Sequence, residues 1–127
     1  MTLREVLHAH LPLLTSESTI RDAVDKMDVY QFPALVIASE EATPTHVITE
    51  GDLSRAIQKN GGLIKIGDKP AYEFASREPV TLGPDAEISD ALQEMLDRGL
   101  TILPVVEDRR LLGVVLRVDL MQALLSE

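Results

Sequence analysis

The sequence predicts a mixed α/β (α+β) fold made of two copies of a β-α-β-β-α unit, and the main reason is an internal duplication. Residues 20–27 (IRDAVDKM) resemble residues 88–95 (ISDALQEM), which lie 68 positions further along the chain. After a loop that is one residue shorter, residues 46–53 (HVITEGDL) align with residues 113–120 (GVVLRVDL). A unit of about 50 residues is too small to bury both sides of its own sheet. We therefore expect the copies to pack together as one domain with pseudo-twofold symmetry.

The first half of each copy is predicted to be a short strand followed by an amphipathic helix. The strands are expected at residues 13–14 and 80–81. Ser18 or Thr19 is expected to cap the first helix and Asp85 the second, and Gly99 lies where the second helix should end. Apolar residues recur at the i, i+3, i+4, i+7 spacing of one helix face, namely Ile20, Ala23, Val24 and Met27 in the first copy and Ile88, Ala91, Leu92 and Met95 in the second.

The second half of each copy is predicted to be a hairpin followed by a helix. The apolar runs 34–38 (ALVIA) and 103–106 (LPVV) are typical of buried strands. Short polar turns join them to strands at 47–49 and 111–116, and helices are expected at 52–60 and 118–126. The chain, residues 1–127, is thus predicted to be a single module. Repeat one covers about 3–60, a connector about 61–77 and repeat two about 78–126.

Composition and charge argue against several classes of protein. The chain has no cysteine, which removes disulfides and cysteine-based metal sites. Its formal net charge of −9 argues against nucleic acid as a partner, because binding phosphates requires a basic surface. No apolar run approaches the length of a membrane span, and the charged first ten residues are unlike a signal peptide. These observations predict a soluble, cytoplasmic protein without membrane insertion.

No arrangement of residues predicts catalysis. His8, His10 and His46 have no spacing that suggests a triad or a metal site, so we interpret them as surface or packing residues. The acidic residues 22, 25 and 28 follow a helical spacing that a solvated helix face explains. The glycine pattern matches no phosphate-binding loop. We therefore expect no enzyme activity, no catalytic residues, no bound metal and no required cofactor.

An aspartate recurs at the start of the second helix of each copy, as Asp52 and Asp119. Such an aspartate can cap the helix by accepting bonds from free backbone N–H groups. In the same position a carboxylate can accept both hydroxyls of a ribose through charge-assisted hydrogen bonds. Thr49 lies three residues before Asp52 and adds a hydroxyl beside that carboxylate. The two interpretations are compatible, and the sequence leaves both open.

The order of these motifs resembles a CBS-domain pair, also called a Bateman module. The resemblance rests on the duplicated Ile-x-x-Ala-hydrophobic-x-x-Met helix start, on the LPVV strand, and on the ending from Gly113 to Leu120. It covers nearly the whole chain, from about residue 3 to about residue 125. It implies a regulatory module that binds an adenosyl compound, such as AMP, ADP, ATP or S-adenosylmethionine, in a cleft between the repeats. It also implies a homodimer.

The resemblance implies two ligand clefts, each with the aspartate of one repeat and apolar residues of the other. The first cleft would contain Thr49 and Asp52 with Val80, Leu100, Thr101 and Ile102. The second would contain Asp119 with Pro12, Phe32, Pro33 and Ala34.

The first cleft is favoured, because the second copy has Leu116 where the family has a threonine or serine. His46 and Val36 also depart from the family pattern, at positions of a usual glycine and proline. Glu50 and the net charge of −9 favour a weakly charged ligand over a polyphosphate, unless Arg55, Arg77 or Arg117 turns inward.

Two functions remain open at the level of sequence. One is a sensor whose adenosyl ligand modulates an unidentified protein effector, which we expect to be a separate polypeptide. The alternative is a ligand-free homodimerisation or interaction scaffold, in which the two aspartates only cap helices and the helices form a self-complementary surface.

Overall fold

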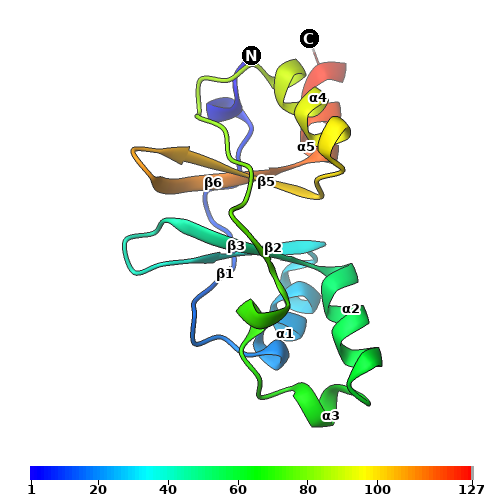
Figure 1. The fold of residues 1–127 in the computed structure, drawn as a ribbon. Coiled ribbons are helices and arrows are strands. Elements are labelled where there is room, and N and C mark those ends of the chain that lie inside the picture. Colours follow the sequence, from blue (N-terminus) through cyan, green and yellow to red (C-terminus); the bar gives the residue numbers. More distant parts are fainter. Residues whose placement is uncertain (127) are drawn as a thin grey trace. The chain divides into compact units, whose positions relative to one another are not determined.

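The computed structural model describes residues 1–126 and divides them into two compact units. The first unit is the continuous segment Pro12–Pro79. The second unit combines Met1–Leu11 with the chain from Val80 onward. Each unit contains one hairpin with helices on it, and Figure 1 shows the elements with their labels.

The first unit contains a four-stranded sheet in the order β1-β2-β3-β4. β1 pairs in parallel with β2, and the other neighbours are antiparallel. In chain order the elements are β1 (Leu13–Leu14), α1 (Ile20–Tyr30), β2 (Ala34–Ala38), β3 (Pro44–Thr49), α2 (Glu50–Lys59), α3 (Leu63–Ile66), the 3-10 helix η2 (Ala71–Phe74) and β4 (Ser76–Arg77). The predicted order of strands and helices is confirmed in this unit.

The second unit has the same plan, but single bridges take the place of the outer strands. Its elements are the 3-10 helix η1 (Leu3–Glu5), α4 (Ile88–Arg98), β5 (Ile102–Glu107), β6 (Arg110–Leu116) and α5 (Arg117–Leu125). β5 and β6 form an antiparallel hairpin. The strand predicted at 80–81 is wrong, because the chain makes only a single parallel bridge there, from Leu82 to Val105. Gly83 and Pro84 follow at once, and proline has no N–H with which to continue a ladder.

The strand registers of the two units are equivalent residue by residue. Ala34 lies opposite Thr49 in the first unit, and Ile102 lies opposite Leu116 in the second. The register shift after Ile37 recurs after Val105, which lies 68 residues later. The duplication seen in the sequence is therefore a duplication of the fold, down to the irregularity in each hairpin.

The opening segment of each repeat belongs to the compact unit that holds the rest of the other repeat. Leu3 begins η1 and Ala71 begins η2, 68 positions apart, and both side chains are fully buried. Leu3 lies in the second unit and Ala71 in the first. The segment expected to be a connector thus supplies α3, η2 and β4 to the first unit.

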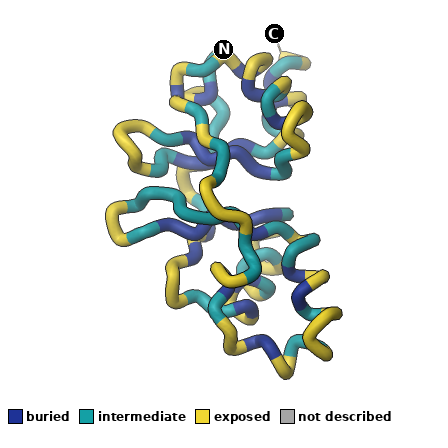
Figure 2. The backbone as a smooth tube through the Cα atoms, in the orientation of Figure 1, coloured by how far each residue is buried: buried dark blue, intermediate teal, exposed yellow. Residues whose placement is uncertain are grey.

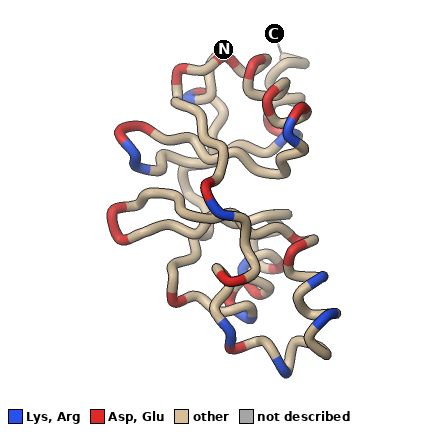
Figure 3. The backbone as a smooth tube through the Cα atoms, in the orientation of Figure 1, with Lys and Arg blue, Asp and Glu red and all other residues tan. Residues whose placement is uncertain are grey.

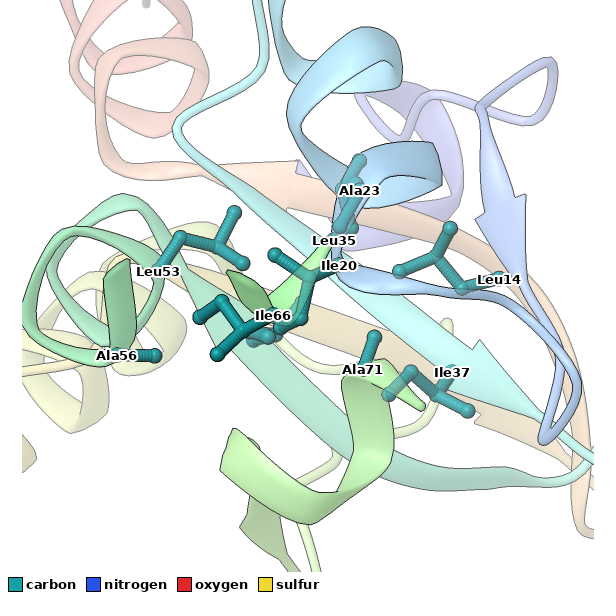
Figure 4. Close-up of a cluster of buried hydrophobic side chains, with 10 residues drawn as sticks. Leu14, Ile20, Ala23, Leu35, Ile37, Leu53, Ala56, Ile66 and Ala71 are labelled. Atoms are coloured by element: carbon teal, nitrogen blue, oxygen red, sulfur yellow. The ribbon is translucent and has the colours of Figure 1, made fainter. Parts of the chain in front are cut away.

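Each unit has its own apolar core, built from equivalent positions. Figure 2 shows that the buried residues lie mainly on the strands and on one side of the helices, and Figure 4 shows the core of the first unit. That core contains Leu14, Ile20, Ala23, Leu35, Ile37, Ile48, Leu53, Ala56, Ile66 and Ala71. The second core contains Leu3, Ile88, Ala91, Met95, Leu103, Val105, Val115, Leu120 and Ala123. The helix faces predicted from the apolar spacing are the faces that pack on these cores.

Caps explain where the first helix of each copy begins and ends. Thr19 caps α1 in a reciprocal capping box with Asp22. The prediction that Asp85 caps the second helix is wrong. α4 begins after Glu87 without a side-chain cap, and Asp85 instead lies 3.5 Å from Arg4. Gly99 ends α4 in the left-handed conformation, as expected, with φ of 65°.

Candidate functional site

The candidate site of the first unit is the turn from β3 into α2, where Thr49 and Asp52 form a capping box. The backbone N–H of Thr49 donates to Asp52 Oδ2 at 2.9 Å, and the backbone N–H of Asp52 donates to Thr49 Oγ1 at 3.1 Å. The Asp52 side chain is only 17% exposed. The two side chains are therefore held together by the helix start itself, and the capping interpretation holds for Asp52.

The capping box leaves hydrogen-bonding capacity at both side chains. The Thr49 hydroxyl accepts the bond from Asp52, so its own proton can be donated to another group. Asp52 Oδ1 accepts a bond from Arg55 Nη2 at 2.8 Å, and each carboxylate oxygen can accept more than one. The arrangement can thus accept two neighbouring hydroxyl groups at Asp52 while donating one from Thr49.

Arg55 lies one turn after Asp52 on α2 and forms an ion pair with that carboxylate. Its side chain is 68% exposed, so the ion pair is weak and the guanidinium can turn away. The sequence indicated Arg55 only as one of three possible inward-facing arginines. The i, i+3 spacing from Asp52 is the signal that selects it.

The equivalent turn of the second unit is built differently. Asp119 Oδ2 accepts the backbone N–H of Leu116 at 2.8 Å, which is the same capping bond. Leu116 has no hydroxyl with which to accept the return bond. His8 Nε2 lies 2.8 Å from the same oxygen, Asp119 Oδ2. The sequence predicts His8 to be a surface or packing residue, and no local pattern indicates its contact with Asp119.

In each predicted cleft, the aspartate belongs to one compact unit and the other predicted residues, apart from Thr49, belong to the other unit. Within the second unit, Ile102 is buried and faces Leu116 in the hairpin register. Within the first unit, the Pro33 carbonyl accepts the backbone N–H of Glu50 at 3.0 Å, beside Thr49. The remaining predicted residues are Val80, Leu100 and Thr101 in the second unit and Pro12, Phe32 and Ala34 in the first. Their membership of a ligand site stays a prediction.

A cavity of about 420 Å³ opens between α1 and α2 of the first unit. Its lining is mainly apolar and includes the acidic residues Asp28 and Glu50. The lining residues are Val24, Met27, Asp28, Gln31, Phe32, Pro33, Glu50, Leu53, Ser54 and Ile57. Thr49 and Asp52 are not among them, although Glu50 of the same turn is, so the cavity borders the capping-box turn.

Acidic residues dominate one hairpin turn and mixed charges the other. Glu40 and Glu41 lie at the tip of the β2–β3 hairpin, whereas the β5–β6 tip carries Glu107 and Asp108 beside Arg109 and Arg110 (Figure 3). Among residues 1–126 no group of three or more histidine, cysteine, aspartate or glutamate side chains could hold a metal ion.

His46 lies beside a second cavity of the first unit, of about 490 Å³, and its charged form is disfavoured. Burial is the larger cause of the lowered pKa of His46, and the positive charge of Arg77 on β4 adds to it. The ring also lies beside Thr45 Oγ1, 2.9 Å from Nδ1, and 5.9 Å from the Tyr72 ring centre.

The lowered pKa of His46 predicts that the fold loses stability in mild acid. Because the unfolded chain binds the proton more tightly, the contribution is complete above about pH 6.5 and is lost as the pH falls toward the lowered folded value. Urea unfolding between about pH 8 and about pH 5 should show a shallower decrease for His46→Gln than for the wild type. Equal slopes would contradict this assignment.

A comparison with protein-family models identifies the two copies. The CBS domain model matches twice, at residues 3–59 and 71–126. The chain belongs to the CBS domain family. The two matches begin at the 3-10 helices η1 and η2. The family repeat therefore includes the opening segment, which belongs to the compact unit that holds the rest of the other repeat.

Sequence relatives of this CBS domain chain are longer proteins. An uncharacterized protein, MK0525, of Methanopyrus kandleri is 32% identical over 99 residues, covering 76% of this chain and 49% of the relative. The mitochondrial CBS domain-containing protein CBSX3 of Arabidopsis thaliana is 30% identical over 118 residues, covering 89% of this chain and 56% of the relative. The chain thus spans about half the length of these two proteins.

Solved structures of CBS-domain pairs share the fold. The structure of CBSX2 in complex with AMP has a TM-score of 0.83 at 21% identity and covers 98% of this chain and 96% of that one. The CBS domain pair of protein MJ0100, in complex with 5′-methylthioadenosine and S-adenosyl-L-methionine, has a TM-score of 0.83 at 22% identity, covering 98% and 99%. Within residues 1–126 of the present CBS pair, none of the helices has both the length and the apolar character needed to cross a membrane.

Proposed function

We propose that the chain is a regulatory module that binds an adenosyl compound at the Thr49–Asp52 turn. This binding modulates the activity of a protein effector. The observation that carries the proposal is the capping box, which holds a carboxylate with free acceptor positions beside a hydroxyl with a free proton. Catalysis is not part of the proposed role.

Two structural neighbours support the ligand class. CBSX2 was solved with AMP, and the MJ0100 pair with two adenosyl compounds, S-adenosyl-L-methionine and 5′-methylthioadenosine. All three compounds have a ribose with neighbouring hydroxyls, which suit a carboxylate with two free acceptor positions.

The charge around Asp52 favours a ligand with few phosphates. Arg55 is the single positive side chain within hydrogen-bonding distance of this carboxylate among the described residues, and Glu50 lies exposed on the same turn. With a formal net charge of −9 the protein repels a polyphosphate. We therefore propose that AMP and S-adenosylmethionine bind more tightly than ATP.

Thermal unfolding with AMP, ADP, ATP and S-adenosylmethionine tests the proposal. At a hundredfold excess over its dissociation constant a ligand adds about 2.7 kcal/mol to stability, which raises the midpoint by several degrees. Asp52→Asn keeps the shape and the capping acceptor but removes the charge, so it should abolish most of that shift. The matched variant Asp119→Asn should retain it.

Flat melting curves for the wild type with all four compounds would overturn the adenosyl proposal. Equal loss in the two variants would instead contradict the choice of the Thr49–Asp52 turn.

A second candidate function is homodimerisation, and exposed apolar side chains on the second unit favour it. Val118, Met121 and Leu125 follow one face of α5 and are 56%, 49% and 81% exposed. Leu96 on the neighbouring helix α4 is 57% exposed. We propose that this surface pairs with another copy of the chain in the cytoplasm. Light scattering should give twice the chain mass for the wild type and the chain mass for Val118→Ser/Met121→Ser.

A further inference from the structure

Asp119, the counterpart of Asp52 in the second unit, already has a side-chain partner from a distant part of the sequence. His8 Nε2 lies 2.8 Å from Asp119 Oδ2, and the Leu116 backbone N–H donates to the same oxygen at 2.8 Å. A carboxylate offers only acceptors, so the proton of this bond lies on the imidazole nitrogen. The Asp119 side chain is 20% exposed and that of His8 is 39% exposed.

The backbone holds His8 in this position. The His8 N–H donates to the Val114 carbonyl at 2.8 Å, and the Val114 N–H donates to the His8 carbonyl at 3.1 Å. This exchange of two bonds makes a hydrogen-bonded antiparallel pair of the two residues. Leu3, at the start of the same segment, is fully buried in the second core. The segment that carries His8 is therefore held on the second unit by its backbone and by Leu3, independently of the imidazole.

The first unit has no imidazole at the equivalent position. Val47 of β3 lies opposite Ser76 of β4, just as Val114 lies opposite His8. Ser76 is exposed, and the Asp52 carboxylate is reached instead by Arg55 of its own helix. The difference between serine at position 76 and histidine at position 8 therefore adds to the differences at the helix start, where Thr49 corresponds to Leu116.

We propose that His8 occupies the hydrogen-bonding position at Asp119 that a ribose hydroxyl would take, and so keeps the second of two equivalent sites closed while Ser76 leaves the first open. The inference rests on the proposed adenosyl-binding function. A ligand must displace the imidazole before it reaches Asp119. Its apparent affinity is therefore its intrinsic affinity multiplied by the fraction of molecules in which the position is free. A charge-assisted bond of this kind lowers affinity by about tenfold to a hundredfold.

Calorimetric titration with AMP, and separately with S-adenosylmethionine, tests the inference through the stoichiometry. We expect one site per chain in the wild type and two in His8→Ser, which installs the residue found at position 76. Adding Asp119→Asn to His8→Ser should return the value to one. The control His10→Ser, a neighbouring exposed histidine, should bind as the wild type does.

The reverse exchange provides a second variant. Ser76→His should weaken binding at the first site by about tenfold or more, and unchanged affinity would count against the proposal. Two sites in the wild type, or a single site in His8→Ser, would overturn the inference while leaving the proposed function in place. If the wild type binds no ligand, and His8→Ser binds one that is lost when Asp119→Asn is added, His8 does close the second site. That result would contradict the claim that the first site, at Asp52, is open. Absence of binding in every variant would overturn both.

Discussion

Replacing Leu103 by alanine is expected to lower the free energy of unfolding by about 2–5 kcal/mol. Leu103 is the second residue of β5 and is fully buried in the second core. Truncation removes buried methyl groups and leaves a cavity that the surrounding strands and helices fill only in part. Urea unfolding followed by circular dichroism measures the loss.

Leu35 provides the matched test of the duplication. It occupies the equivalent position on β2, is also fully buried, and belongs to the first core. Leu35→Ala should therefore cost an amount in the same range. Val29→Ala, at an exposed position of α1, should change stability by no more than about 0.5 kcal/mol. A cost below about 1 kcal/mol at Leu103 or Leu35 would contradict the assignment of the cores.

Gly113→Ala is expected to destabilise the protein by about 1–3 kcal/mol, because an added methyl group has no space. A Cβ on Gly113 would lie against the His8 carbonyl oxygen and 2.7 Å from Leu7 Cδ1. The backbone oxygen belongs to the bridged segment and cannot rotate away, so residues 7–8 must move off β6. Loss of stability should be accompanied by faster hydrogen exchange of the His8 amide.

Gly83→Ala is the control for this substitution. Its added Cβ would have the Val106 carbonyl oxygen at 3.9 Å as its nearest neighbour, which is an ordinary contact. Its stability should stay close to that of the wild type or rise by about 0.4–1 kcal/mol. Gly113→Ala with unchanged stability and an equally protected His8 amide would show that the segment is not held where the structure has it.

The fold was predictable from the sequence because the duplication repeats the positions that decide packing. Ile20 and Ile88, like Leu35 and Leu103, carry the same apolar spacing and occupy the same core positions. The exchange of opening segments was not predictable in this way. Leu3 and Ala71 lie in short 3-10 turns, where three or four residues give too little periodicity to reveal which core they join.

The candidate site was predictable only in its local part. The Thr49-x-x-Asp52 spacing predicts a capping box, and the box is present. The contact of His8 with Asp119 joins residues 111 positions apart, and no local pattern reports such a pair. At Asp85 a local pattern predicts a contact that is not formed. Aspartate is a residue type suited to capping, but Asp85 lies two residues before the position that precedes α4, and it pairs with Arg4 instead.

Amide chemical shifts during a titration with AMP test the central claim most directly. If the Thr49–Asp52 turn holds the ribose, the backbone N–H signals of Thr49 and Asp52 should shift saturably, because both groups bond to the side chains that the ligand would engage. The signals of Leu116 and Asp119 should shift far less. Shifts at Leu116 and Asp119 with none at Thr49 and Asp52, or no shift at either turn, would contradict the account.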